Sequence, residues 1–290
     1  MSQTRKVIEV EHLSEIFDGV KEDLKSRKSV PQYPTKLRDL DKLIWGIHKK
    51  ELFVIGARPS MGKTSLAGQL AFNLADANHN VLFISLEMSK EQIVERLFCN
   101  VTRINNLDLR EGKIDDKVKA RMDIFDKLIE NLPLCVVDRC GYNFSDIETL
   151  IKEMDPKPDI VFLDYIQLIS QGRHQNKVSA IEEYFRRLKE LSISYNLAMI
   201  VLSQIRRMSE GRQNRRPTMD ELKGSGSLEE HSDSVALIYW IKRSEFSHED
   251  INEFEINVAK QRHGAIGLVK VDFFPQYFSF SDRNEEYNGD

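Results

Sequence analysis

The sequence has little cysteine and no long apolar run. Its three cysteines, Cys99, Cys135 and Cys140, lack the spacing of a metal site, and we expect the reduced thiols of a cytoplasmic protein. Cys135 lies in the apolar run 134–137 and is expected to be a small core residue. No apolar run reaches the roughly 20 residues that span a bilayer, and residues 1–6 lack a secretory hydrophobic core. We therefore expect no membrane partner.

Basic residues are not in excess. The net charge is −4 over 290 residues, with 41% hydrophobic and 30% charged residues, which are globular values. A surface that is basic all round is excluded, but a basic channel or loop that binds nucleic acid is not. The length suits one large α/β domain or two small ones.

Strand and helix patterns alternate from residue 52 onward. This alternation predicts an α/β fold with a mostly parallel central sheet flanked by helices. The expected strands are 52–55, 81–87, 134–138, 159–165 and 198–204, and the expected helices are 65–72, 89–102, 115–131, 178–195 and one opened by a capping box at Ser145–Glu148. Four further strands, at 234–240, 254–260, 268–274 and 277–280, have short connections and are expected to be antiparallel additions at the sheet edge.

An amphipathic helix is predicted over 10–26, followed by a tether that contains Pro31 and Pro34. The apolar face of this helix could pack on its own domain or dock on a neighbouring subunit. We divide the chain into this helix and tether (1–35), the α/β domain (36–282) and a polar tail (283–290).

The segment 57–65 has the pattern of a phosphate-binding loop between a strand and a helix. Such a loop directs backbone N–H groups and a helix N-terminus toward phosphate, its lysine reaches the β- and γ-phosphates, and its threonine hydroxyl ligates Mg²⁺. The candidate ATP-binding residues are Ala57, Arg58, Pro59, Ser60, Met61, Gly62, Lys63, Thr64 and Ser65. Ala57 stands where the pattern usually has its first glycine. The alternative is an ordinary strand-to-helix turn with a chance lysine.

Three more polar residues end predicted strands, where open α/β sheets bind ligands. Asp164 follows four apolar residues, as in a Walker B strand, and can hold Mg²⁺ with Thr64. Glu87 can orient and deprotonate the attacking water. Gln204 can sense the γ-phosphate and signal to the loop that follows it. Alternatively, Glu87 is an N-cap or a surface carboxylate before the helix at Ser89.

The loop after Gln204 is rich in arginine, and its Gly-Ser stretch offers free backbone N–H groups. It suits contact with a nucleic-acid backbone, although a solvated charged loop is the alternative. The candidate DNA-binding residues are Arg206, Arg207, Lys223, Gly224, Ser225 and Gly226.

Lys260 and Arg262 end a predicted strand and point to the same face. Two cations far along the chain from the phosphate loop suit an arginine finger that completes a nucleotide site on an adjacent subunit. A solvated strand end is the equal alternative.

Together these motifs resemble the RecA-like P-loop ATPase domain of DnaB-family replicative DNA helicases. The matching segments are 56–64, 85–88, 163–168, 202–204, 224–227 and 259–262, within a resemblance that covers about 11–280. The resemblance implies a homo-hexameric ring that hydrolyses ATP between subunits and moves 5′ to 3′ on single-stranded DNA. It also implies that Glu87 is the catalytic glutamate, that Gln204 is the sensor, that Lys260 and Arg262 act in trans, and that the first helix grips the next subunit.

Two departures from the family accompany this resemblance. Lys223-Gly224 stands where the family often has Arg-Glu, and the family's N-terminal helical domain is missing, which indicates either a fragment or a short protein without the primase-binding collar. Primase and a helicase loader are further expected partners. The competing functions are a recombinase or clock-type RecA relative and a nucleotide-switched assembly scaffold, neither of which unwinds DNA.

Overall fold

A computed structural model describes residues 12–26, 32–170, 177–205, 215–222, 224–241 and 251–283. The chain forms two compact units, residues 1–31 and residues 32–290. In the first, α1 (Leu13–Ser26) forms where the amphipathic pattern predicts a helix. The apolar residues of its stripe are all exposed: Leu13, Ile16, Phe17, Val20 and Leu24. Within the described residues, no helix has the length and apolarity that crossing a bilayer requires.

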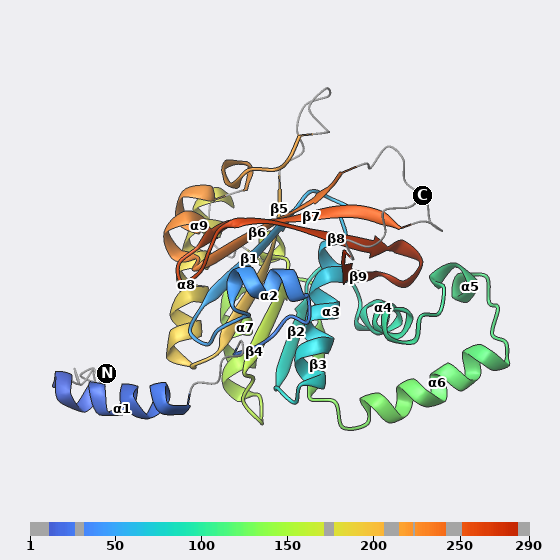
Figure 1. Cartoon of the computed structure of the whole chain (residues 1–290), viewed down its shortest axis with the longest axis horizontal. Coiled ribbons are helices and arrows are strands. Elements are labelled where there is room, and N and C mark those ends of the chain that lie inside the picture. The colour runs from blue at the N-terminus through green and yellow to red at the C-terminus, as the bar shows by residue number, and fades with distance from the viewer. Residues whose placement is uncertain are drawn as a thin grey trace. The chain divides into compact units, whose positions relative to one another are not determined.

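The second unit is a nine-stranded sheet in the order β3-β2-β4-β5-β1-β6-β7-β8-β9 (Figure 1). The strands are β1 (Leu52–Ala57), β2 (Val81–Ser85), β3 (Leu134–Asp138), β4 (Ile160–Asp164), β5 (Ala198–Gln204), β6 (Ser234–Trp240), β7 (Asn252–Gln261), β8 (Gly267–Phe274) and β9 (Ser279–Asp282). The described helices of this unit are α2 (Arg38–Ile44), α3 (Lys63–Asp76), α4 (Lys90–Thr102), α5 (Asn106–Arg110), α6 (Asp116–Ile129), α7 (Phe144–Glu153), α8 (Lys177–Ser194) and α9 (Ser225–His231), with short 3₁₀ turns at Ile166–Leu168, Met219–Glu221 and Pro275–Tyr277.

The predicted fold class is confirmed, with one correction at the edge. β1 to β6 are parallel to one another, and β7, β8 and β9 add antiparallel strands. The expectation that the strand 234–240 is antiparallel is wrong, because β6 pairs with β1 in parallel. The chain crosses over through α9 before β6, so β6 can run in the same direction as β1. β7, β8 and β9 are joined by shorter connections, and each runs antiparallel to the strand before it.

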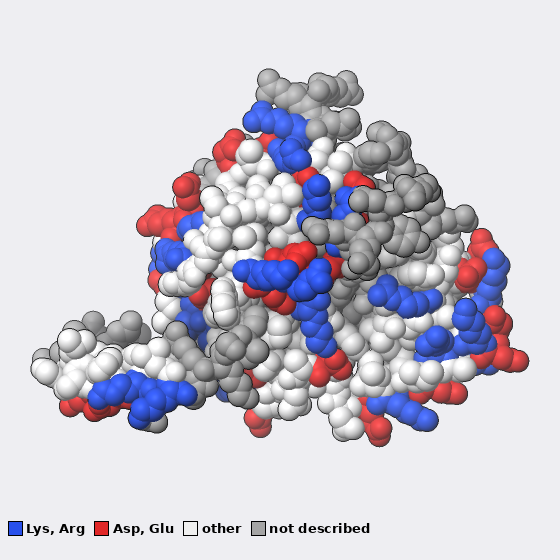
Figure 2. Space-filling model, viewed as in Figure 1, with Lys and Arg blue, Asp and Glu red and all other residues white. Residues whose placement is uncertain are grey.

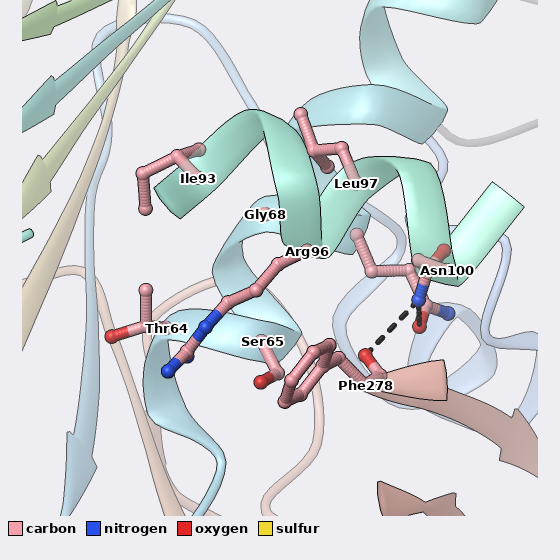
Figure 3. A pocket seen from close by; sticks show the side chains of 9 residues that line it. Thr64, Ser65, Gly68, Ile93, Arg96, Leu97, Asn100 and Phe278 are labelled. Carbon is pink, nitrogen blue, oxygen red and sulfur yellow. Dashed lines mark hydrogen bonds between the residues drawn. The ribbon is translucent and has the colours of Figure 1, made fainter. Parts of the chain in front are cut away.

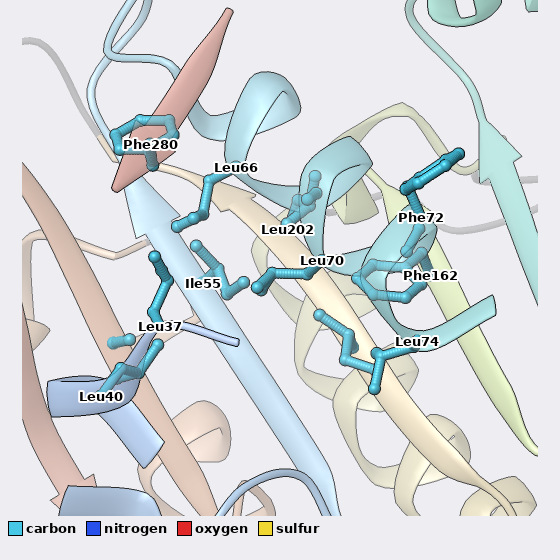
Figure 4. Close-up of a cluster of buried hydrophobic side chains, with 14 of the residues drawn as sticks. Leu37, Leu40, Ile55, Leu66, Leu70, Phe72, Leu74, Phe162, Leu202 and Phe280 are labelled. Carbon is cyan, nitrogen blue, oxygen red and sulfur yellow. The ribbon is translucent and has the colours of Figure 1, made fainter. Parts of the chain in front are cut away.

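Two apolar cores cover the two faces of the sheet. Successive strand residues point to opposite faces, so Ile55 faces the core under α2, α3, α4 and α6, while Val54 faces the core under α7, α8 and α9. Leu66 and Leu70 of α3 pack over Ile55 (Figure 4). Side chains therefore cover both faces of the sheet, and the candidate site lies at the ends of the strands.

Two local predictions are also wrong. Asn143, not Ser145, caps α7, because its side chain accepts from the N–H groups of Ser145 and Asp146, and Asp146 completes the capping box. Cys135 is exposed rather than in the core, since β3 is an edge strand that is only partly covered.

Candidate functional site

The phosphate loop lies between β1 and α3, as the sequence predicts. Gly62 is the residue before α3 and has a φ of 69°, in the left-handed region. A Cβ at this position would lie 3.0 Å from the Phe280 ring, so both the backbone and the packing require glycine. Lys63 and Thr64 open α3, whose first backbone N–H groups have no partner within the helix. The loop therefore has the geometry of an anion cradle.

Gly56, one place before Ala57, lies close to side chains of neighbouring segments. A Cβ on Gly56 would lie 2.8 Å from a methyl carbon of Leu237 and 2.9 Å from one of Leu222. Glycine is thus needed one place earlier, inside β1, to let β6 and the 3₁₀ turn approach. Ala57 is the last residue of β1 and is buried.

Asp164 joins the phosphate loop to β4. Its carboxylate is fully buried, and one oxygen accepts a 2.6 Å hydrogen bond from the Thr64 hydroxyl. The other oxygen, Oδ1, lies 3.4 Å from Lys63 Nζ and accepts no hydrogen bond within the described residues. Lys63 Nζ also lies 4.1 Å from the centre of the Tyr165 ring. Burial lowers the pKa of Lys63, and the charges of Asp164 and Glu87 oppose that shift.

A cavity of about 620 Å³ opens over these residues. It is lined by predicted site residues that are far apart in the sequence: Ala57, Arg58, Pro59, Ser60, Met61, Gly62, Lys63, Thr64, Glu87 and Gln204. Asp164 lies beneath it, in contact with Lys63 and Thr64, and Ser65 lines a smaller cavity beside α4. The cavity also has lining residues that the sequence analysis missed, namely Met88, Gln92, Arg96 and Tyr165.

Arg96 is the most significant of the missed residues. Its side chain extends from α4 toward Thr64 and Ser65 and lies beside Phe278, with the guanidinium carbon 4.9 Å from the ring centre (Figure 3). Burial lowers its pKa, while Asp164 opposes the shift. The available signal was the spacing of Gln92 and Arg96, which places both on one face of a helix but fits any exposed polar stripe equally well.

Glu87 lines the cavity with an exposed side chain. The alternative that it caps α4 is wrong, because Ser89 is the N-cap and forms a capping box with Gln92. Met88 N–H donates to the Ser85 hydroxyl, which fixes the turn that follows β2. Glu87 is therefore directed to the cavity by a turn that does not use its carboxylate.

Gln204 lies beside Ala57 in the register of β5 and β1. Its backbone N–H donates to Gln167 Oε1 at 3.1 Å, and Gln167 Nε2 donates to the Ser203 hydroxyl at 2.9 Å. Gln167 is buried, and it ties the end of β5 to the turn after β4. The strands that carry Asp164 and Gln204 are thus held together at their ends, a contact that the sequence pattern did not reveal.

Lys260 and Arg262 do not lie at this cavity. β7 is antiparallel to β6, so Gln261 pairs with Ser234, and Ser234 lies beside Phe53 at the opposite end of β1 from the phosphate loop. The two cations therefore lie at the amino ends of the parallel strands.

The predicted DNA-binding residues are described only in part. Arg206, Arg207 and Lys223 lie outside the described residues. Gly224 has a φ of 74° and precedes α9, and a Cβ there would lie 3.1 Å from Ile181 on α8. Ser225 and Gly226 are the first residues of α9. Figure 2 shows Lys and Arg interspersed with Asp and Glu on the visible face.

The segment 215–222, at the end of the loop that follows Gln204, is anchored beside the phosphate loop. Arg58 pairs with Glu221 at 3.4 Å, and both side chains are nearly buried. Ile205, directly after Gln204, and Leu222, at the end of this segment, pair in an antiparallel β-bridge.

The family model described as "DnaB-like helicase C terminal domain" matches residues 33–282. The chain belongs to this family. The predicted family resemblance is thereby confirmed, and the match begins after the unit that contains α1.

Individual relatives agree with the family. The chain is 33% identical over 260 residues to replicative DNA helicase DnaB of Geobacillus stearothermophilus, covering 88% of this chain and 57% of that protein. It is 31% identical over 282 residues to replicative DNA helicase DnaC of Bacillus subtilis, covering 95% and 62%. The chain thus spans about three fifths of the length of these relatives.

Two solved structures share the fold, each with a TM-score of 0.85 and 27% identity. One is a DnaB-like replicative helicase described with its interactions with primase, for which the match covers 94% of this chain and 69% of the other. The second is a protein described as an ATPase domain, for which the match covers 95% of this chain and 100% of the other.

Proposed function

We propose that this chain is the ATP-hydrolysing motor of a replicative DNA helicase. As a cytoplasmic homo-hexamer, it would hydrolyse ATP between subunits, translocate 5′ to 3′ on single-stranded DNA and unwind duplex. The observation that carries the proposal is that Lys63 and Thr64 line the same cavity as Glu87 and Gln204 and contact the buried Asp164 beneath it. Family membership supports a helicase over a recombinase or a scaffold.

The oxygen atoms of Asp164 and Thr64 are suited to hold a Mg²⁺ ion that arrives with the nucleotide. Asp164 Oδ1 is buried without a hydrogen bond from the described residues, and the Thr64 hydroxyl lies within hydrogen-bond distance of the same carboxylate. Mg²⁺ is commonly held by one or two protein oxygens together with substrate phosphates and water. Bound there, it would offset the negative charge that develops on the phosphates.

Each residue at the cavity then has a physical role. Lys63 Nζ, which lies 3.4 Å from Asp164 Oδ1, would contact the β- and γ-phosphates, whose negative charge would favour its charged form against the effect of burial. Glu87 accepts a proton from the attacking water at its carboxylate, which the turn after β2 directs to the cavity. Gln204 donates to the γ-phosphate through its side-chain amide, and its backbone is fixed by Gln167.

DNA and assembly contacts complete the proposal. The segment 206–226 would contact the phosphates of single-stranded DNA, and its return arm is anchored beside the phosphate loop by Glu221 and Arg58. The exposed apolar stripe of α1 would dock on the next subunit. Primase and a loader are proposed further partners.

The test is ATP hydrolysis by Lys63→Ala, measured with and without single-stranded DNA. We expect turnover to be lost, because Lys63, which lies in the phosphate loop 3.4 Å from Asp164 Oδ1, is the residue proposed to contact the β- and γ-phosphates. Lys90→Ala is the matched control, because Lys90 is exposed and outside the cavity, and it should hydrolyse ATP normally. Turnover that survives Lys63→Ala ends the proposal, and turnover that DNA does not stimulate favours a scaffold over a motor.

A further inference from the structure

The C-terminal end of α9 holds Lys260 and Arg262, the two cations that the family resemblance predicts to act in trans. Lys260 Nζ donates to the carbonyls of Glu229 and Ser232, the latter at 2.6 Å. Arg262 Nη2 donates to the Glu230 carbonyl at 2.9 Å. Carbonyls at a helix C-terminus carry partial negative charge and lack partners within the helix, so they are suited to bind cations. The two side chains are therefore placed by one short segment, 229–233.

Asp233 is the charged centre of that segment. Its side chain is 3% exposed, and Oδ1 accepts from Arg262 Nη1 at 3.2 Å. Oδ2 accepts from the Leu52 N–H at 2.7 Å and from Lys189 Nζ at 2.6 Å. The Asp233 carbonyl also accepts from the Arg262 N–H at 2.9 Å. The start of β1, α8 and the end of β7 thus converge on one buried carboxylate.

Arg262 remains available to a partner while it is held. A guanidinium carries five N–H donors in a planar fork, and the two side-chain contacts engage one donor on each of two nitrogens. The side chain is 46% exposed. Burial and the nearby Arg262 charge lower the pKa of Lys260, and Asp233 opposes that shift. The carboxylate therefore supports two adjacent cations, one of which faces solvent.

The same contacts place Arg262 too far from its own phosphate loop to act there. Phe53, which lies beside Ser234, is four residues from Ala57, or about 13 Å along β1, and the loop continues beyond Ala57. Arg262 follows Gln261, which pairs with Ser234, so Arg262 lies beyond Ser234 on the side away from the phosphate loop. Only the nucleotide of another copy can meet it.

We propose that Asp233 is a positioning residue for the hydrolysis of ATP bound to the adjacent subunit, because it holds Arg262 in the orientation that reaches that nucleotide. The inference rests on the proposed function. Asp233 touches no nucleotide itself. It acts by fixing one side of the guanidinium, so that little conformational freedom is lost when the other side meets phosphate.

The test compares Asp233→Asn with the unchanged protein as assembled hexamers. Asparagine has nearly the same shape but lacks the charge that orients Arg262. We expect kcat for ATP to fall about 10- to 100-fold, as for a misplaced reacting group, with KM within about three-fold. In an Arg262→Ala background the same change should lower kcat less than about two-fold, because the group that it positions is gone. An unchanged or raised kcat, or an equal loss in both backgrounds, overturns the proposal.

Lys189→Gln is the matched control. The Lys189→Gln change removes the second cation that contacts Asp233 but leaves the contact between Asp233 and Arg262. Any general effect of disturbing the buried carboxylate should therefore appear in this variant as well. Its kcat should stay within about two-fold of the unchanged protein. A loss equal to that of Asp233→Asn would show that the carboxylate is merely structural. If Asp233→Asn does not assemble, Asp233→Glu keeps the charge and displaces it by one methylene, and the same loss of kcat is expected.

Mixing separates this inference from the proposed function. Asp233→Asn subunits have an intact phosphate loop, and Glu87→Gln subunits have an intact finger, so mixed hexamers should regain hydrolysis. If Arg262→Ala regains hydrolysis with Glu87→Gln but Asp233→Asn does not, the positioning role fails and the trans finger stands. If neither mixture regains hydrolysis, the proposed function itself fails.

Discussion

Replacing Arg96 with Met should weaken ATP binding by about 10- to 150-fold. Arg96 reaches from α4 toward the start of α3, where a phosphate bound by the cradle would lie (Figure 3). Hydrogen bonds to charged groups contribute about 1.5–3 kcal/mol, and each 1.4 kcal/mol is about ten-fold in Kd. Methionine has a similar length and keeps the apolar contact with Phe278, so the change removes mainly the charge.

Titration with a fluorescent ATP analogue measures the effect directly. Thermal unfolding provides a second readout. At a fixed excess of ATP, a ten-fold weaker Kd reduces the stabilisation that ATP gives to the folded protein by about 1.4 kcal/mol. Arg103→Met is the matched control, because Arg103 ends the same helix and lies against Phe274 and Tyr277, outside the cavity. ATP binding by Arg96→Met within about two-fold of the unchanged protein, in a folded hexamer, would refute this role.

Three further changes test the loop and its charge. Gly62→Ala should lower the free energy of unfolding in urea by about 1–3 kcal/mol, because alanine is strained at a φ of 69° and its Cβ would press on Phe280. Gly56→Ala should cost about 1–3 kcal/mol through contact with Leu237 and Leu222, although its φ is ordinary. Without nucleotide, Lys63→Met should flatten the pH dependence of stability. Because burial lowers the folded-state pKa of Lys63, the unfolded chain binds more protons, and stability rises with pH up to the ordinary lysine pKa. A Lys63→Met protein with the same alkaline slope as the unchanged protein would contradict this assignment.

Regular alternation and strand-end chemistry made much of the fold and cavity predictable. Continuous apolar strands followed by Lys63, Asp164 or Gln204 encode both a parallel sheet and the edge at which ligands bind. These signals are local, since Asp164 and Gln204 are the last residues of their strands and Lys63 follows β1 after one short loop. The positions of Lys63, Thr64 and Asp164 in contact with one another therefore followed from the sequence.

Features that depend on packing between distant segments were not predictable. The direction of β6 depends on the path of the chain through α9, and the exposure of Cys135 depends on β3 being an edge strand. Arg96 comes to the cavity because α4 packs on α3, which no residue pattern within α4 records. Asn143 and Ser145 both suit an N-cap, and only the geometry of the turn selects Asn143.

The central claim is that the phosphate loop of one subunit and Arg262 of the next form one ATP site. Its most direct test is hydrolysis by mixtures of Arg262→Ala and Glu87→Gln subunits, each of which should retain only a low residual rate alone. In random hexamers at equal amounts, about one quarter of the interfaces would pair an intact loop with an intact finger. The account predicts a maximum near equal amounts, at about one quarter of the unmutated rate. Mixtures that stay at the residual rate of the single variants at every ratio, while forming hexamers, would contradict it.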